Sequence, residues 1–86
     1  MADLAYESVE ERLAHILLSL RERHGVHEGS NIRIDLPLSQ QDLADMIGSS
    51  RQRVNHELRK LADQGLIREE RCRITILDDE RLRNLR

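Results

Sequence analysis

Two short amphipathic segments separated by only three residues constrain the fold of this chain more than any other feature. One follows Ser39 and stops at Gly48, and the other follows Ser50 and stops at Gly65. Serine is a preferred N-cap of helices, and glycine tolerates the left-handed conformation in which many helices end. The sequence therefore predicts two helices joined by a tight, glycine-containing turn, the arrangement of a helix-turn-helix motif.

Hydrophobic periodicity predicts the elements that precede this pair. A helix is expected over residues 9–24, opened by a capping box that begins at Ser8 and ended by Gly25. Apolar and charged residues alternate over 32–36, which predicts a short half-buried strand ended by Pro37. The residues between the helix and this strand are expected to form a polar loop.

A small hairpin is expected after the second helix of the motif. Residues 66–69 and 73–77 are strand candidates, with Ile74 and Ile76 supplying a period of two and a charged tip at 70–72. A hairpin in this place makes the helix-turn-helix a winged one.

The remaining residues complete a single domain. Asp78 is expected to cap a short terminal helix. The predicted fold class is mainly α with a small β-hairpin wing, a winged helix-turn-helix domain over residues 8–86. Residues 1–7 are expected to be a hinge or linker remnant.

The composition argues against an enzyme. Of 86 residues 38% are apolar, and Tyr6 is the sole aromatic residue, so little volume is left for a substrate pocket beside a core. The sequence has neither a Ser, His and Asp arrangement nor a phosphate-binding loop. His15, His24 and His27 lack a convincing further ligand set, so we expect no metal and no cofactor.

The sequence also indicates the compartment. No apolar stretch approaches the roughly 18 residues of a membrane span, and the first ten residues lack the pattern of a secretory signal. Cys72 is the only cysteine and cannot form an internal disulfide. We expect a cytoplasmic protein that does not bind membranes.

The charge is unevenly distributed. Residues 1–50 contain nine acidic and four basic side chains, whereas residues 51–86 contain seven acidic and ten basic ones. Binding of a polyanion depends on the local field at the docking surface rather than on the net charge, which is −2 here. The asymmetry favours a nucleic-acid contact made by the second half.

Short stretches along nearly the whole chain carry a resemblance to one family. They read ERLA at 11–14, LSQQDLA at 38–44, GSSR at 48–51, GLI at 65–67 and RITILD at 73–78. On these residues the chain resembles the C-terminal DNA-binding domain of the cyclic-AMP receptor protein and fumarate-nitrate regulator superfamily of bacterial transcription factors. The resemblance implies sequence-specific binding of double-stranded DNA in transcription regulation.

The resemblance places the base-reading positions at the start of the second helix of the motif, on Arg51, Gln52 and His56. The chemistry agrees, because Arg can donate two hydrogen bonds to guanine and Gln can pair with adenine in the major groove. Asn55 lies with these three on one helical edge, opposite the apolar stripe. We predict that all four contact bases.

Other polar residues are expected to contact DNA phosphates, because hydroxyl, amide, guanidinium and helix-start N–H groups suit phosphate oxygens. These residues are Ser39, Gln40, Ser49, Ser50, Arg53, Arg59, Arg71 and Arg73. For the two wing arginines, Arg71 and Arg73, an ordinary solvent-facing position beside the acidic residues 69–70 is an equal alternative.

Glu57 departs from the family pattern, which usually has an apolar or small residue at this place. A fully buried carboxylate is costly. Arg53 lies four residues before it and Lys60 three after, so either can form an ion pair with it on a helix. Pairing with these cations and repulsion of nearby phosphate both remain open, as does the effect on DNA affinity.

The resemblance also implies partners outside this sequence. Regulators of the family carry an effector-binding β-barrel and a dimerisation helix before the DNA-binding domain, and they bind two-fold symmetric operators as dimers. Neither part fits before Ser8, so the chain is either an excised domain or a stand-alone winged helix. We expect a monomer. In activators of the family the loop after the first helix contacts RNA polymerase, here residues 25–30.

A winged helix can also serve as a protein–protein interaction module without specific DNA binding, and the net negative charge suits that alternative. Salt dependence distinguishes the two functions, because phosphate binding releases counterions with a steep logarithmic slope.

Overall fold

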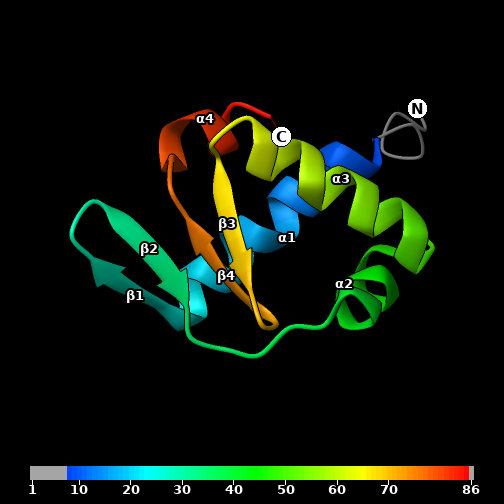
Figure 1. The fold of residues 1–86 in the computed structure, drawn as a ribbon, viewed down its shortest axis with the longest axis horizontal. Helices are drawn as coiled ribbons and strands as arrows, with labels where there is room; N and C mark the ends of the chain where they lie inside the picture. Colours follow the sequence, from blue (N-terminus) through cyan, green and yellow to red (C-terminus); the bar gives the residue numbers. More distant parts are fainter. Residues whose placement is uncertain (1–7, 86) are drawn as a thin grey trace, which may run out of the picture.

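The computed structural model describes residues 8–85, so the hinge or linker expected at residues 1–7 lies outside the described residues. Within this range the elements follow in the order α1 (Val9–His24), β1 (Gly25–Glu28), β2 (Asn31–Ile34), α2 (Gln40–Ile47), α3 (Arg51–Asp63), β3 (Ile67–Glu70), β4 (Arg73–Ile76) and α4 (Asp79–Arg83). The predicted fold class is confirmed, with α2 and α3 as the helix-turn-helix and the β3–β4 hairpin as the wing (Figure 1).

The helices begin and end where their caps predict. Ser8 accepts a hydrogen bond from the backbone N–H of Glu11, whose carboxylate accepts one from the backbone N–H of Ser8. Ser39 and Asp42 form the same reciprocal pair at the start of α2. Gly48 ends α2 in the left-handed conformation with φ 78°. No helix within the described range is both long and apolar enough to span a membrane.

The strands form one antiparallel sheet in the order β1-β2-β4-β3, which corrects two sequence expectations. The residues after Gly25 form strand β1 rather than a polar loop, because their backbone pairs with β2 even though most of their side chains are exposed. The strand expected over 32–36 ends at Ile34, because the N–H of Leu36 bonds the carbonyl of Ile34 and turns the chain.

The core lies between the helices and one face of the sheet. Its fully buried side chains come from every layer: Leu13 and Leu17 of α1, Leu43 of α2, Leu58 and Leu61 of α3, Ile34, Ile67, Ile74 and Ile76 of the sheet, and Leu82 of α4. The β1–β2 hairpin and α2 lie at opposite ends of the molecule, whose longest extent is 40 Å (Figure 1). One side of α3 is left without protein cover among the residues described.

Candidate nucleic-acid interface

The turn between α2 and α3 is held by backbone hydrogen bonds. The N–H groups of Gly48 and Ser49 both donate to the carbonyl of Ala44, at 2.8 and 3.0 Å. From α1, the Nη1 of Arg12 donates to the carbonyl of Ile47 at 2.9 Å, which satisfies an end of α2 that lacks intrahelical partners. The start of α3 is therefore fixed against the body of the domain.

Helix α3 turns one stripe to the core and another to solvent. Val54, Leu58 and Leu61 are buried together with Glu57, whereas Arg51, Gln52 and His56 are exposed and Asn55 is half-buried. At about 100° per residue, the four predicted base-contacting residues occupy one continuous edge of the helix away from the core. The structure brings them together, and their contact with bases remains a prediction.

A shallow hollow follows the exposed side of α3. It is lined by Gln52, Asn55, His56, Arg59, Lys60 and Asp63. Lys60 and Asp63 were not among the predicted interface residues, although their spacing of four and seven residues from His56 is the signal that places them on this side. Arg59 lies between the base-reading candidates and the C-terminal end of α3, where Lys60 and Asp63 lie.

Helices α2 and α3 are linked through two of the predicted DNA-contacting residues. The Nε2 of Gln40 donates a 2.9 Å hydrogen bond to the Oδ1 of Asn55 in a partly buried position. Because these residues are 15 apart in the sequence, helical spacing gives no signal for the contact. It holds the first turn of α2 against the middle of α3.

The serines expected at phosphates serve the helix ends. The Oγ of Ser39 accepts from the N–H of Asp42, and the Oγ of Ser50 accepts from the N–H of Arg53, at 3.0 and 3.1 Å. A hydroxyl that accepts in this way still carries its own proton and can donate to another oxygen. Ser49 is half-buried in the turn between them.

Glu57 forms ion pairs with cations on both sides. Its Oε2 lies 3.6 Å from the Nε of Arg53, and its Oε1 lies 3.4 Å from the Nζ of Lys60. The carboxylate is buried, with 6% of its side chain exposed, and it pairs with both of the cations that the sequence offered as partners. Arg51 and Arg59 have no ion-pair partner among residues 8–85.

The wing turn is tethered to the segment before α2. Its two central residues, Arg71 and Cys72, have φ 49° and 63°, which matches the twist of a two-residue hairpin loop. The N–H of Leu38 donates to the carbonyl of Cys72 at 2.7 Å. Arg73 donates to the Oδ1 of Asp35 at 3.0 Å, whereas Arg71 is exposed and has no ion pair in the described part of the chain.

Asp35 is shared by two arginines. Arg33 donates to the same oxygen at 2.9 Å and also bonds Glu28, joining the first hairpin to the wing. Hydrogen bonding and Coulombic attraction by Arg33, with a smaller contribution from Arg73, hold the pKa of Asp35 below its ordinary value. The bonds to Glu28 and then Asp35 raise the pKa of Arg33. Arg73 is therefore engaged within the protein, unlike Arg71.

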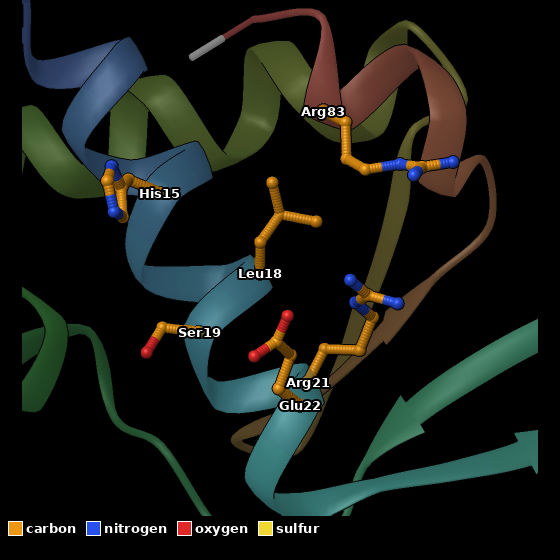
Figure 2. Close-up of a pocket in the computed structure, with 6 residues that line it drawn as sticks. All are labelled: His15, Leu18, Ser19, Arg21, Glu22 and Arg83. Atoms are coloured by element: carbon orange, nitrogen blue, oxygen red, sulfur yellow. The ribbon is translucent and has the colours of Figure 1, made fainter.

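A second hollow lies on the α1 and α4 side of the molecule. It is lined by His15, Leu18, Ser19, Arg21, Glu22 and Arg83 (Figure 2). Both of its arginines lie 3.2 Å from Asp79, one at each carboxylate oxygen. No residue of α2 or α3 lines this hollow, so it is separate from the exposed side of α3.

Comparison with known sequences gives consistent matches. The sequence model of the Crp-like helix-turn-helix domain matches residues 11–85. The CRP-like cAMP-activated global transcriptional regulator of Mycobacterium tuberculosis is 40% identical over 82 residues, covering 95% of this chain and 37% of that protein. The nitrogen fixation regulation protein FixK of Bradyrhizobium diazoefficiens is 34% identical over 85 residues, covering 99% and 36%. The chain thus spans a little over a third of the length of these relatives.

Solved structures show the same fold. A transcriptional regulator of the CRP/FNR family from Thermus thermophilus aligns with a TM-score of 0.84 at 31% identity, covering 95% of this chain and 42% of that one. Oxidized CprK in complex with o-chlorophenolacetic acid aligns with a TM-score of 0.87 over 98% of this chain and 36% of its own, at 20% identity. The second likeness concerns the fold alone.

Proposed function

The chain belongs to the Crp-like helix-turn-helix family, and on this premise we propose that it binds double-stranded DNA sequence-specifically and acts in bacterial transcription regulation. Helix α3 enters the major groove, and the β3–β4 wing lies beside the DNA backbone. Transcription regulators of bacteria work in the cytoplasm and act by binding rather than by catalysis, and we assign both properties to this chain.

The observation that carries the proposal is the exposed edge of α3. Arg51, Gln52, Asn55 and His56 lie together on the side of the helix that faces away from the core. Arg51 has no ion-pair partner among the described residues, so its guanidinium is available for the O6 and N7 of a guanine. A bidentate pair of this kind discriminates against a wrong base by about 1–3 kcal/mol.

The phosphate contacts frame this edge. Ser39, Ser49 and Ser50 lie at the starts of the two helices, where N–H groups and the helix dipole favour anions. Arg53 and Arg59 extend from α3, and Gln40 from α2. On the wing, Arg71 is the stronger candidate because Arg73 already binds Asp35.

The number of domains that act together determines how tightly the DNA is bound. A regulator that pairs two copies of this domain recognises a two-fold symmetric operator with half-sites about 34–36 Å apart. Two linked half-site contacts gain about 10² to 10⁴ in affinity, so the domain as a monomer binds a single half-site weakly. Strand β1 and the turn that follows it, residues 25–30, are the candidate contact for RNA polymerase, and their exposed position supports that assignment.

The test is selection from a random duplex library, followed by binding titrations at several salt concentrations. Arg51→Ala is compared with Arg23→Ala, which removes an exposed arginine from the last turn of α1. We expect an enriched sequence motif and a steep salt slope, with the preference at one base pair relaxed in Arg51→Ala only. No enrichment and no slope would instead indicate a winged helix that docks a protein.

A further inference from the structure

We propose that Glu57 acts as a built-in counterion of the DNA-binding helix, holding Arg53 and Lys60 and thereby lowering affinity for every duplex regardless of its sequence. This inference rests on the proposed DNA-binding function. It assigns a role to the one acidic side chain that α3 buries.

The geometry of α3 places these three residues on a different flank of the helix from Arg51 and Asn55. At about 100° per residue, Arg53 and Lys60 lie within about 20° of each other on the helix, on one flank of its exposed side. Arg51 and Asn55 lie on the other flank, where Asn55 accepts a hydrogen bond from Gln40 of α2. Glu57 lies on the core side of the first flank, beneath the two cations.

The contacts show that Glu57 holds both cations while leaving them within reach of a ligand. The carboxylate is 3.6 Å from Arg53 and 3.4 Å from Lys60, yet 61% of the Arg53 side chain and 44% of the Lys60 side chain remain exposed. The long stems of these residues let the charged groups stay at the surface above the buried carboxylate.

Stability alone does not explain why a carboxylate occupies position 57. Its Oε1 is buried and makes no hydrogen bond, although the Nζ of Lys60 lies 3.4 Å away, and taking a carboxylate out of water costs free energy. An apolar residue of similar volume would continue the stripe formed by Val54, Leu58 and Leu61, and buried ion pairs are often no more stable than such a replacement. The role of the carboxylate therefore lies in the two cations with which it pairs.

The consequence for DNA binding follows from charge. A free arginine at a phosphate releases a condensed counterion, and this release dominates the affinity for any sequence. Arg53 and Lys60 already carry an internal anion between them, so the group presents one net positive charge instead of two. Because phosphates are the same in every duplex, the attenuation is equal for a selected operator and for random DNA.

The test uses a random-sequence duplex and the duplex obtained by selection, titrated at several salt concentrations. Glu57→Gln keeps the side-chain volume and removes the charge. We expect affinity for both duplexes to rise about three- to tenfold at low salt, the salt slope to steepen by about 0.9, and the ratio between the duplexes to stay unchanged. Thermal unfolding checks that the variant folds.

The matched control is Asp63→Asn, the same change of charge on the same helix at a residue without an ion pair in the described range. Adding Arg53→Gln to each variant completes two double-mutant cycles. We expect Arg53→Gln to cost more affinity in the Glu57→Gln background than in the native chain. Its cost should be the same with and without Asp63→Asn.

Each outcome is decisive. A folded Glu57→Gln variant with native or weaker affinity for random duplex overturns the inference while leaving the proposed function intact. Absence of salt-dependent DNA binding by the native chain overturns both. If Glu57→Gln does not fold, single variants of the native chain decide: Arg53→Gln is expected to cost less affinity for random duplex than Arg59→Gln, and equal losses reject the role of Glu57.

Discussion

Gln40 at the start of α2 donates a 2.9 Å hydrogen bond to Asn55 in the middle of α3. The bond joins a residue expected at phosphate to one expected at a base. It leaves the amide protons of Asn55 and the amide oxygen of Gln40 available. Each side chain is therefore oriented by the other and can still form hydrogen bonds with DNA. The hydrogen bond therefore holds α2 against α3 and orients two side chains that we predict to contact DNA.

Substitutions at Asn55 separate these two roles. Asn55→Ala leaves Gln40 without its acceptor and is expected to lower the free energy of unfolding by about 1 kcal/mol. Asn55→Asp keeps the acceptor for Gln40 but adds a negative charge to the DNA-facing side, so we expect near-native stability and at least tenfold weaker DNA binding. Chemical denaturation and duplex titration measure the two effects. Equal stability losses in both variants would show that the hydrogen bond contributes nothing.

Substitutions of Arg51 and Arg59 are expected to change different properties of DNA binding. Arg51→Ala should relax preference at one base pair by about 1–3 kcal/mol, whereas Arg59→Ala should weaken all sequences alike and reduce the salt slope by about 1. Titration of a selected duplex and its single-base variants distinguishes them. The assignment of roles is wrong if the two variants change the same quantity.

The helices of this fold could be predicted from the sequence because their signals are local. Ser8, Ser39 and Ser50 each accept a hydrogen bond from an N–H three residues later, and Gly48 ends α2 in the conformation that glycine favours. Such interactions depend only on neighbours along the chain. The exposed edge of α3 follows from the same helical spacing.

What the sequence could not predict depends on contacts across the fold. Strand β1 is held by backbone pairing with β2, and its side chains do not alternate between buried and exposed positions. Burial of Glu57 and its simultaneous contact with two cations depend on how α3 packs. The tether from Leu38 to the wing joins residues 34 apart, so no local pattern reports it.

Acid should weaken the link between the first hairpin and the wing through Asp35. The pKa of this carboxyl is lowered in the folded protein, so its ionisation contributes stability at pH values above the pKa of the unfolded chain, about 3.8. This contribution is lost as the pH falls through the lower pKa of the folded protein. We expect Asp35→Asn to flatten the acid side of a plot of thermal midpoint against pH below about 4. Asp63→Asn is the control, and an identical flattening there would contradict the assignment.

Gly25 is required by close packing rather than by a left-handed backbone. Its φ is −76°, but a Cβ at this position would meet the carbonyl oxygen of Arg21 at 2.4 Å and the side chain of Ile32 at 2.9 Å. Gly25→Ala is expected to lower the free energy of unfolding by about 1–3 kcal/mol through overpacking at the junction of α1 and β1. Ser30→Ala, at the exposed end of the same hairpin, should have little effect. A native midpoint for Gly25→Ala in chemical denaturation would contradict this interpretation.

The wing turn contains a removable strain at Cys72. Its φ of 63° lies in the left-handed region, which costs a residue with a side chain about 1 kcal/mol relative to glycine. Cys72→Gly is therefore expected to raise the free energy of unfolding by about that amount, whereas Cys72→Ser removes the thiol but keeps the strain and should leave stability unchanged. Because the carbonyl that binds Leu38 is retained, DNA affinity should persist in both variants.

Arg71→Gly relieves the neighbouring strain in the same way but removes the free arginine of the wing, so it should gain stability and lose affinity for every duplex. A wing that contributes no phosphate contact would instead leave the affinity of Arg71→Gly at the native value.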